Sequence, residues 1–321
     1  MRKLGWLLLI LIVALTGGAL LVAQDWGGRG PLAHALSFEV PEGASLAGTA
    51  DRLQQAGAIR SASRFKLYAR LFGSAAPIKS GEYRLPRGLS AADILKLLQG
   101  GRTIQRFVTI PEGWPAILVQ ERLLATPGLS GTVPVPVEGS VLPDSYSFQR
   151  GDTRADVLDR MQRAMAAYLA DAWQRRKPGI AVKTPREALI LASIVEKETG
   201  KPSERRLVAA VYSNRLKQGV KLDADPTTIY PITKGKPLGR RILLSELRAK
   251  NAYNTYATIG LPQGPICNPG RASIDAVLDP ADSSALYFVA DGTGGHVFAD
   301  TLDQHNANVL KWRAYRAAHG I

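Results

Sequence analysis

The stretch TPREALILASIVEKETG, residues 184–200, holds the pattern that decides the fold of this chain. Thr184 is suited to cap a helix, a proline follows at the first helical position, and Glu187 completes a capping box. Residues 188–195 are apolar apart from one serine, and a helix that is apolar nearly all round is buried. Gly200 predicts where the helix ends. We therefore predict a buried central helix that carries two glutamates in its last turn.

The two glutamates differ in their position on this helix. Glu198 continues the apolar stripe formed by Leu191, Ile194 and Val195, whereas Glu196 lies off it. Burial and the negative end of the helix dipole both raise the pKa of a carboxyl group in such a place. A carboxylic acid that stays protonated near neutral pH can serve as a general acid. Glu198 is therefore the candidate acid and Glu196 a solvated or supporting residue, unless both are ordinary surface residues at a helix end.

The composition is that of a globular protein with a basic surface. Of 321 residues, 45% are apolar and 21% are charged, which excludes a mainly disordered or collagen-like chain. The 41 basic and 27 acidic residues give a formal net charge of +14. The single cysteine, Cys267, excludes an intramolecular disulfide, and His296 and His305 lack metal-ligand spacing. We therefore expect no metal site and no cofactor.

The N-terminus predicts a membrane anchor. Residues 4–23 contain no charged side chain and are long enough, as a helix, to span a hydrocarbon core. Arg2 and Lys3 precede this segment and the next basic residue is Arg29, so the positive-inside rule places the N-terminus in the cytoplasm. A cleaved signal peptide is the alternative, and in both cases the rest of the chain is exported. Export argues against nucleic acid as the partner of the basic charge and favours anionic wall polymer or lipid.

The remaining pattern predicts an α+β protein in four parts. These are a cytoplasmic tip and transmembrane helix at 1–24, a Gly-rich linker at 25–36, a small α/β domain with its connector at 37–124, and a larger mixed α+β domain at 125–321. In the small domain we expect strands at 37–40, 80–85 and 104–110 and helices at 45–56, 63–71, 90–98 and 116–124. In the larger domain we expect helices at 153–176, at 184–200 and between a cap at Ser203 and a stop at Gly219, and a hairpin of 286–290 with 296–298.

Several segments, taken in chain order, form a recognisable set. They are EGSVLPDSY at 138–146, LASIVEKET at 191–199, VYSNRL at 211–216, LDADPTTIY at 222–230, AYNTY at 252–256 and GLPQGPI at 260–266. Together they closely resemble the endolytic murein transglycosylases, the MltG or YceG-like family, in which 222–230 corresponds to a substrate loop. The resemblance implies a single-pass protein of the inner (cytoplasmic) membrane. It also implies a LysM-like small domain and a periplasmic or extracytoplasmic lytic transglycosylase domain.

The resemblance further implies an activity. Members of this family are lyases that cut the bond between N-acetylmuramic acid and N-acetylglucosamine within nascent glycan strands and leave a 1,6-anhydro end. The catalytic glutamate of the family matches Glu198 best, and Glu196 is the alternative because the two lie two positions apart. Peptidoglycan strands are the expected substrate, and association with the peptidoglycan polymerases is a further expectation of the family.

One carboxyl group suffices for this chemistry. Glu198 protonates the leaving oxygen and then, as a carboxylate, takes the proton of the C6 hydroxyl that replaces water. Two alternatives stay open: a muramidase-type hydrolase with Asp225 or Asp144 as second carboxylate, and a non-catalytic peptidoglycan-binding scaffold. The candidate substrate-binding residues, whose rings, amides and hydroxyls suit a sugar groove, are Asn214 (equally suited to helix packing), Asp225, Thr227, Tyr230, Asn254 and Tyr256.

Overall fold

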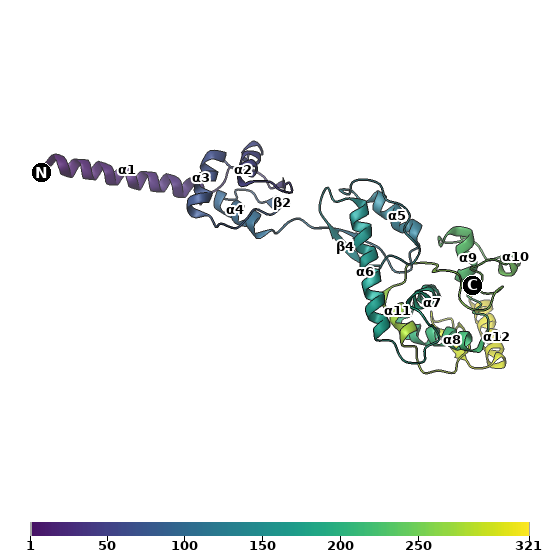
Figure 1. Cartoon of the computed structure of the whole chain (residues 1–321). Helices are drawn as coiled ribbons and strands as arrows, with labels where there is room; N and C mark the ends of the chain where they lie inside the picture. Colours follow the sequence, from purple (N-terminus) through teal and green to yellow (C-terminus); the bar gives the residue numbers. More distant parts are fainter. Residues whose placement is uncertain (1, 321) are drawn as a thin grey trace. The chain divides into compact units, whose positions relative to one another are not determined.

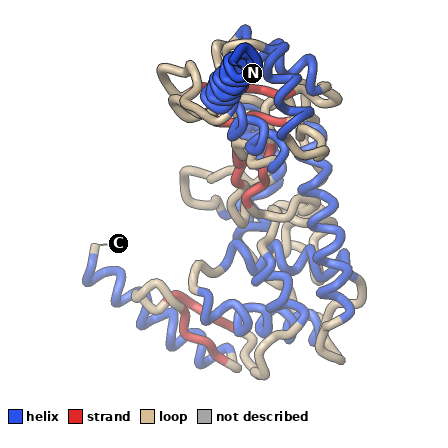
Figure 2. Tube along the Cα trace, turned by 90° about the vertical axis from the view of Figure 1, so that its left-hand side faces the viewer, coloured by secondary structure: helices blue, strands red, loops and turns tan. Residues whose placement is uncertain are grey.

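The computed structural model describes residues 2–320, and the chain divides into two compact units (Figure 1). The first unit holds the chain up to Arg106 together with Phe148–Arg150, and the second holds Phe107–Ser147 and the chain from Gly151 onward. Helices make up about half of the described chain, and its strands form three two-stranded sheets (Figure 2). The mixed α+β class predicted from the sequence is confirmed.

The border between the units lies earlier in the chain than the boundary at 124–125 predicted from the sequence. The reason is that helix α5 (Ala116–Ala125) is tied to the second unit. The Ala116 amide donates a hydrogen bond to Glu138 Oε1 at 2.8 Å, and the Gly113 amide just before the helix donates to the Asn268 carbonyl oxygen at 2.9 Å. The segment predicted as a connector therefore belongs to the larger unit.

The first helix, α1 (Arg2–Trp26), is apolar, and its last residue, Trp26, packs against the core of the first unit. Its window Leu9–Trp26 is long and apolar enough to cross a membrane, and none of that window is buried. This agrees with the anchor predicted at 4–23. The helix continues to Trp26, however, and Leu32 is buried in the core of the first unit. Part of the predicted linker at 25–36 is therefore packed structure.

The first unit is built on two antiparallel strands, β1 (Leu36–Val40) and β2 (Gly81–Leu85). Besides α1, the helices of this unit are α2 (Leu46–Gln55) and α3 (Ala62–Phe72), which lie between the strands in sequence, and α4 (Ala91–Gly100) after them. A serine caps each helix by accepting a hydrogen bond from a backbone amide of its first turn, and these serines are Ser45, Ser61 and Ser90. The apolar sides of all five elements meet in one core, which includes Phe38, Leu53, Phe65, Tyr83 and Leu98.

The second unit is mainly helical. Besides α5, its helices are α6 (Arg154–Gln174), α7 (Pro185–Glu198), α8 (Arg205–Gln218), α9 (Asp225–Thr233), α10 (Leu244–Arg248), α11 (Arg271–Leu278) and α12 (Leu302–His319). Strands β3 (Arg106–Thr109) and β4 (Ser145–Phe148) form one two-stranded sheet, and β5 (Tyr287–Ala290) and β6 (His296–Ala299) form the predicted antiparallel hairpin. Helices α6, α8 and α11 pack around α7, which confirms the predicted burial of that helix.

Three local predictions were wrong. Helix α7 ends at Glu198 rather than at Gly200. Ser203 does not cap α8, because it lies inside a 3-10 turn that precedes the helix. Residues 222–230 were expected as a loop, but from Asp225 onward they belong to α9. Pro226 is compatible with that helix because a first-turn amide has no partner within the helix.

Candidate active site

Glu198 is the last residue of α7. Thr184 caps the start of this helix by accepting a hydrogen bond from the Glu187 amide at 3.1 Å, as predicted, and Ile194 and Val195 before Glu198 are fully buried. Glu198 itself is partly buried, but its Oε1 is buried completely and makes no hydrogen bond to any residue of the described chain. A buried carboxyl oxygen without a protein partner is available to a ligand.

The surroundings of Glu198 raise its pKa to about 7. Burial is the largest cause, because it disfavours the charged form. A hydrogen bond from the Tyr212 hydroxyl on α8 acts in the opposite direction, and the negative charge of Asp225 raises the pKa further. At neutral pH a large share of the molecules therefore carries a protonated Glu198, which is the state that a general acid requires.

Three other side chains surround this carboxyl group. Tyr212 is buried, and its burial holds the pKa of the hydroxyl well above its usual range. Asp225 begins α9 and is exposed, and its Oδ1 accepts a hydrogen bond from the Tyr256 hydroxyl at 2.7 Å. Burial is the main cause of the raised pKa of Tyr256, and the charges of Asp225 and Glu198 add to it. We refer to Glu198, Tyr212, Asp225 and Tyr256 as the Glu198 cluster.

The two other acids considered from the sequence make different contacts. Glu196 lies next to the chain before α11, where its Oε2 accepts a hydrogen bond from the Gly270 amide at 2.9 Å. Asp144 accepts a hydrogen bond from the Ser145 amide and pairs with Arg271 at 2.9 Å, and these contacts hold its pKa below the usual value. The second carboxylate whose charge acts on the candidate acid is therefore that of Asp225.

Three predicted substrate-binding residues use their polar groups inside the protein. The Asn214 amide donates to two backbone carbonyl oxygens, at 2.8 and 3.0 Å. Asn254 is fully buried, and its amide donates to three backbone carbonyl oxygens near α10. Thr227 is also fully buried, with its hydroxyl 2.9 Å from that of Thr255. This last contact joins α9, which begins with Asp225, to the segment that carries Tyr256. Direct contact of Asn214, Asn254 and Thr227 with a ligand stays a prediction.

Tyr230, the remaining predicted residue, is paired with an acid that the sequence analysis gave no role. Its hydroxyl donates to Glu138 Oε2 at 3.2 Å, and its ring lies 4.8 Å from that of Tyr253, centroid to centroid. Burial raises the pKa of Glu138 to about 7, although hydrogen bonds from the Ala116 amide and Tyr230 act against the rise. The only sequence signal for Glu138 is its place at the start of the segment 138–146.

A pocket of about 420 Å³ lies in the same unit and is lined by chain neighbours of the Glu198 cluster. It reaches Lys197 and Pro226, which adjoin Glu198 and Asp225 in the chain. Its walls are largely apolar and aromatic, and they include Trp114, Leu118, Ile229, Tyr230 and Ile266. Rings and apolar side chains of this kind suit the faces of sugar rings. The second unit thus combines a carboxyl group of raised pKa with a pocket, lined by its chain neighbour Lys197, that a carbohydrate can occupy.

Comparison with known proteins identifies the family to which the chain belongs. The family model described as the YceG-like family matches residues 38–311. The chain belongs to the YceG-like family. A crystal structure of a YceG-like protein from Listeria monocytogenes covers 85% of the chain and 99% of that protein, with 27% sequence identity and a TM-score of 0.52.

Two curated proteins are similar to this YceG-like chain, and both are named endolytic murein transglycosylase. The one from Bacillus subtilis (strain 168) is 28% identical over 84% of the chain and 83% of its own length. The one from Streptococcus pneumoniae serotype 2 (strain D39 / NCTC 7466) is 30% identical over 85% of the chain. The match spans 57% of the Streptococcus protein.

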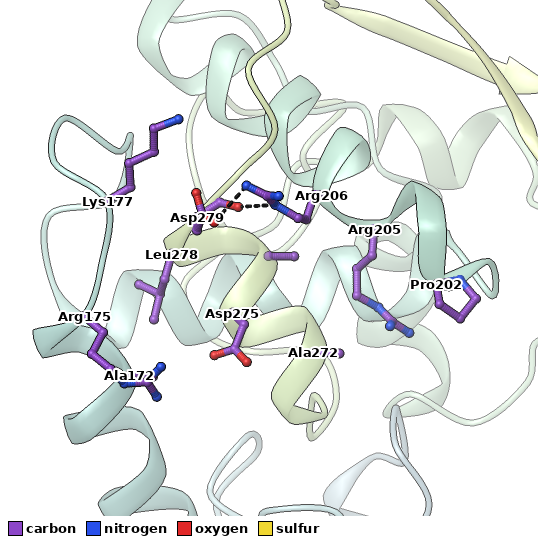
Figure 3. A pocket seen from close by; sticks show the side chains of 11 residues that line it. Ala172, Arg175, Lys177, Pro202, Arg205, Arg206, Ala272, Asp275, Leu278 and Asp279 are labelled. Carbon is purple, nitrogen blue, oxygen red and sulfur yellow. Dashed lines mark hydrogen bonds and ion pairs between the residues drawn. The ribbon is translucent and has the colours of Figure 1, made fainter.

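The YceG-like chain has another pocket, of about 560 Å³, among α6, α8 and α11 (Figure 3). Arg206 and Asp279 lie at its edge and are hydrogen-bonded at 2.8 Å. Its lining contains neither a member of the Glu198 cluster nor a residue that adjoins one in the chain, so we treat it as separate from the candidate active site.

Proposed function

We propose that this YceG-like chain is an endolytic murein transglycosylase, a lyase that cleaves peptidoglycan strands between N-acetylmuramic acid and N-acetylglucosamine and leaves 1,6-anhydro ends. The names of its Bacillus and Streptococcus relatives support the activity. The observation that carries the chemistry is the Glu198 carboxyl group. It is buried at Oε1 and has no partner there among the described residues, and the adjoining Lys197 lines a pocket with aromatic walls.

In the first step, protonated Glu198 gives its proton to the glycosidic oxygen while the bond from that oxygen to C1 of the muramic acid breaks. Positive charge then develops on C1 and the ring oxygen. The carboxylate of Asp225, which the Tyr256 hydroxyl holds at 2.7 Å, stabilises this charge electrostatically. The pKa of about 7 keeps enough Glu198 protonated at neutral pH for this step.

In the second step, the Glu198 carboxylate accepts the proton of the C6 hydroxyl of the same sugar, and the C6 oxygen bonds to C1. Tyr212 stays protonated because its pKa is raised, so it donates a hydrogen bond to the Glu198 carboxylate that exists between the two steps. The proton regained from C6 returns Glu198 to its starting state. Since the internal hydroxyl takes the place of water, one carboxyl group serves both steps.

The other residues bind or position the substrate in this proposal. Tyr230 lines the pocket and offers its ring to a sugar face. Asp225 and Tyr256 contact the sugars next to the scissile bond. Thr227 and Asn254 hold the segments that carry these two residues, and Asn214 fixes α8 through its backbone contacts.

The remaining parts of the proposal concern the first unit and its surroundings. Helix α1 is an uncleaved single-pass anchor in the inner (cytoplasmic) membrane with its N-terminus in the cytoplasm and both units outside. The first unit is a LysM-like module that binds glycan, which its order of strand, two helices and strand supports. The protein acts next to the peptidoglycan polymerases, where nascent strands appear.

A muramidase-type hydrolase is the second candidate function. The observation that favours it is the exposed carboxylate of Asp225 beside Glu198, because a second carboxylate can activate water. In that case the products carry reducing ends in place of anhydro ends.

The assignment of Glu198 is tested with two matched variants of the full-length protein on uncrosslinked glycan strands. We expect Glu198→Gln to fold and to lose activity by about 10²–10⁴-fold, the usual contribution of a general acid. We expect Glu196→Gln to stay active, because glutamine keeps an acceptor for the Gly270 amide. A folded Glu198→Gln protein with wild-type activity, or loss confined to Glu196→Gln, would overturn the assignment.

A further inference from the structure

Helix α3 carries an apolar surface that the first unit leaves uncovered. Leu67, Leu71 and Phe72 are exposed by 52%, 63% and 57%. Leu71 and Phe72 lie three and four residues after the buried Tyr68, and Leu67 lies four before Leu71, so all four share one continuous side of the helix. An exposed apolar surface of this kind marks contact with another apolar body.

This side of α3 is continuous with the end of α1. The Trp26 ring, in the last residue of α1, lies 5.8 Å from the ring of Phe65 and 5.9 Å from that of Tyr68, and Tyr68 in turn lies 6.1 Å from Phe72. Asp25 pairs with Arg64 of α3 at 3.3 Å. Figure 1 shows α3 beside the point where α1 meets the first unit. The end of α1 and α3 therefore form one packed structure.

The length of the uncharged segment of α1 determines how far α3 lies from the hydrocarbon core of the bilayer. The uncharged segment 4–23 ends three residues before Trp26, which is about 5 Å along a helix. When that segment spans the hydrocarbon core, Trp26 lies in the interfacial layer, where tryptophan is enriched. Because α3 packs against Trp26, the same layer is within reach of its exposed apolar side chains.

The charge of α3 suits the same layer. Lys66 pairs with Asp51, and Arg64 pairs with Asp25. Arg70, one position before Leu71, is exposed and has no ion-pair partner among residues 2–320. A free guanidinium beside an apolar surface is able to bind lipid phosphate while the leucines reach the acyl chains.

We infer that α3 is a second membrane contact of this protein. Leu67, Leu71 and Phe72 enter the interfacial layer of the bilayer that α1 spans, and Arg70 binds the phosphate of an anionic lipid. The inference rests on the proposed anchoring by α1. It means that the first unit is held on the membrane surface, so that a glycan strand is bound close to the place where it emerges.

The test uses spin labels on the full-length chain in vesicles of phosphatidylethanolamine and phosphatidylglycerol. Single cysteines are introduced in a Cys267→Ala background as Leu67→Cys, Leu71→Cys and, on the polar flank of α3 that also carries Arg70, Lys66→Cys. Leu15→Cys within α1 reports whether the anchor itself is inserted. For each label, collision with oxygen, which concentrates in lipid, is compared with collision with a water-soluble nickel chelate.

We expect the ratio of oxygen collisions to nickel collisions to be several-fold higher for the labels at positions 67 and 71 than for the label at 66. The label at 15, inside the bilayer, should show a high ratio as well. Labels at 67 and 71 that match the one at 66, while the label at 15 is inserted, overturn the inference and leave the anchor intact. A label at 15 that reports water overturns the anchor and the inference with it. Adding Arg70→Gln to Leu71→Cys is expected to reduce the preference of the label for oxygen. An unchanged preference would contradict the binding of lipid phosphate by Arg70.

Discussion

Replacing Glu198 with glutamine is predicted to stabilise the second unit at alkaline pH while it abolishes activity. In the folded protein the pKa of Glu198 rises from 4.5 to about 7, mainly because the group is buried. Each tenfold change in proton affinity is worth about 1.4 kcal/mol, so ionising this carboxyl group costs the folded state about 3 kcal/mol. Glutamine has a similar shape and carries no charge at any pH, so the variant avoids that cost.

The sign of the effect follows from the raised pKa. Below about pH 4.5 the carboxyl group is protonated in both the folded and the unfolded chain, and Glu198 costs nothing. The cost grows as the pH rises and is complete above about pH 7, where both states are ionised. The free energy of unfolding of Glu198→Gln, relative to wild type, should therefore increase by about 3 kcal/mol between about pH 4 and about pH 9.

Hydrogen exchange measured by mass spectrometry provides the assay on the full-length chain. Amides of α7 and α8 are compared in wild type and variant at the same pH, so that the intrinsic dependence of exchange on pH cancels. The expected result is similar protection at acid pH and stronger protection of the variant at alkaline pH. If the difference in protection between wild type and variant is the same at acid and alkaline pH, the burial of an ionisable Glu198 is refuted.

Other substitutions test the neighbours of the candidate acid and the core behind it. Asp225→Asn removes a charge that raises the pKa of that acid, so the alkaline limb of the profile of kcat/KM against pH should move to lower pH, and an unmoved limb would contradict the coupling. Glu138→Ala leaves the Ala116 amide without its acceptor, so it should lower the free energy of unfolding by about 1–3 kcal/mol and raise KM. Glu138→Gln keeps an acceptor and should restore both the stability and KM. Equal losses in the two variants, measured by thermal unfolding and steady-state kinetics, would argue against this role. Ile194→Ala in the buried part of α7 should cost about 2–5 kcal/mol in urea unfolding, and the exposed control Ile259→Ala should cost little; equal losses would contradict the assigned core.

Features set by neighbouring residues were predictable from the sequence. The cap at Thr184 and the burial of α7 follow from a local pattern of capping and apolar residues, and both are observed. The same holds for α1, for the serine-capped helices of the first unit and for the hairpin of β5 and β6. In each case the residues that decide the structure lie within a few positions of each other.

Features set by distant residues were not predictable in this way. Glu138 and Tyr230 are 92 positions apart in the chain and meet only because the second unit folds the loop that carries Glu138 against α9. The position of Tyr212 next to Glu198 depends on how α8 packs against α7. Helix α9 was missed because the family resemblance assigned residues 222–230 to a substrate loop, although Pro226 suits a helix start.

The central claim is that one buried carboxyl group cuts glycan strands without water. Mass spectrometry of uncrosslinked strands digested by the full-length protein tests it most directly. The account predicts 1,6-anhydromuramic ends that arise at internal positions of the strands, and no such products from Glu198→Gln. Products heavier by one water would contradict the account and would make the protein a hydrolase that uses Asp225 as its second carboxylate.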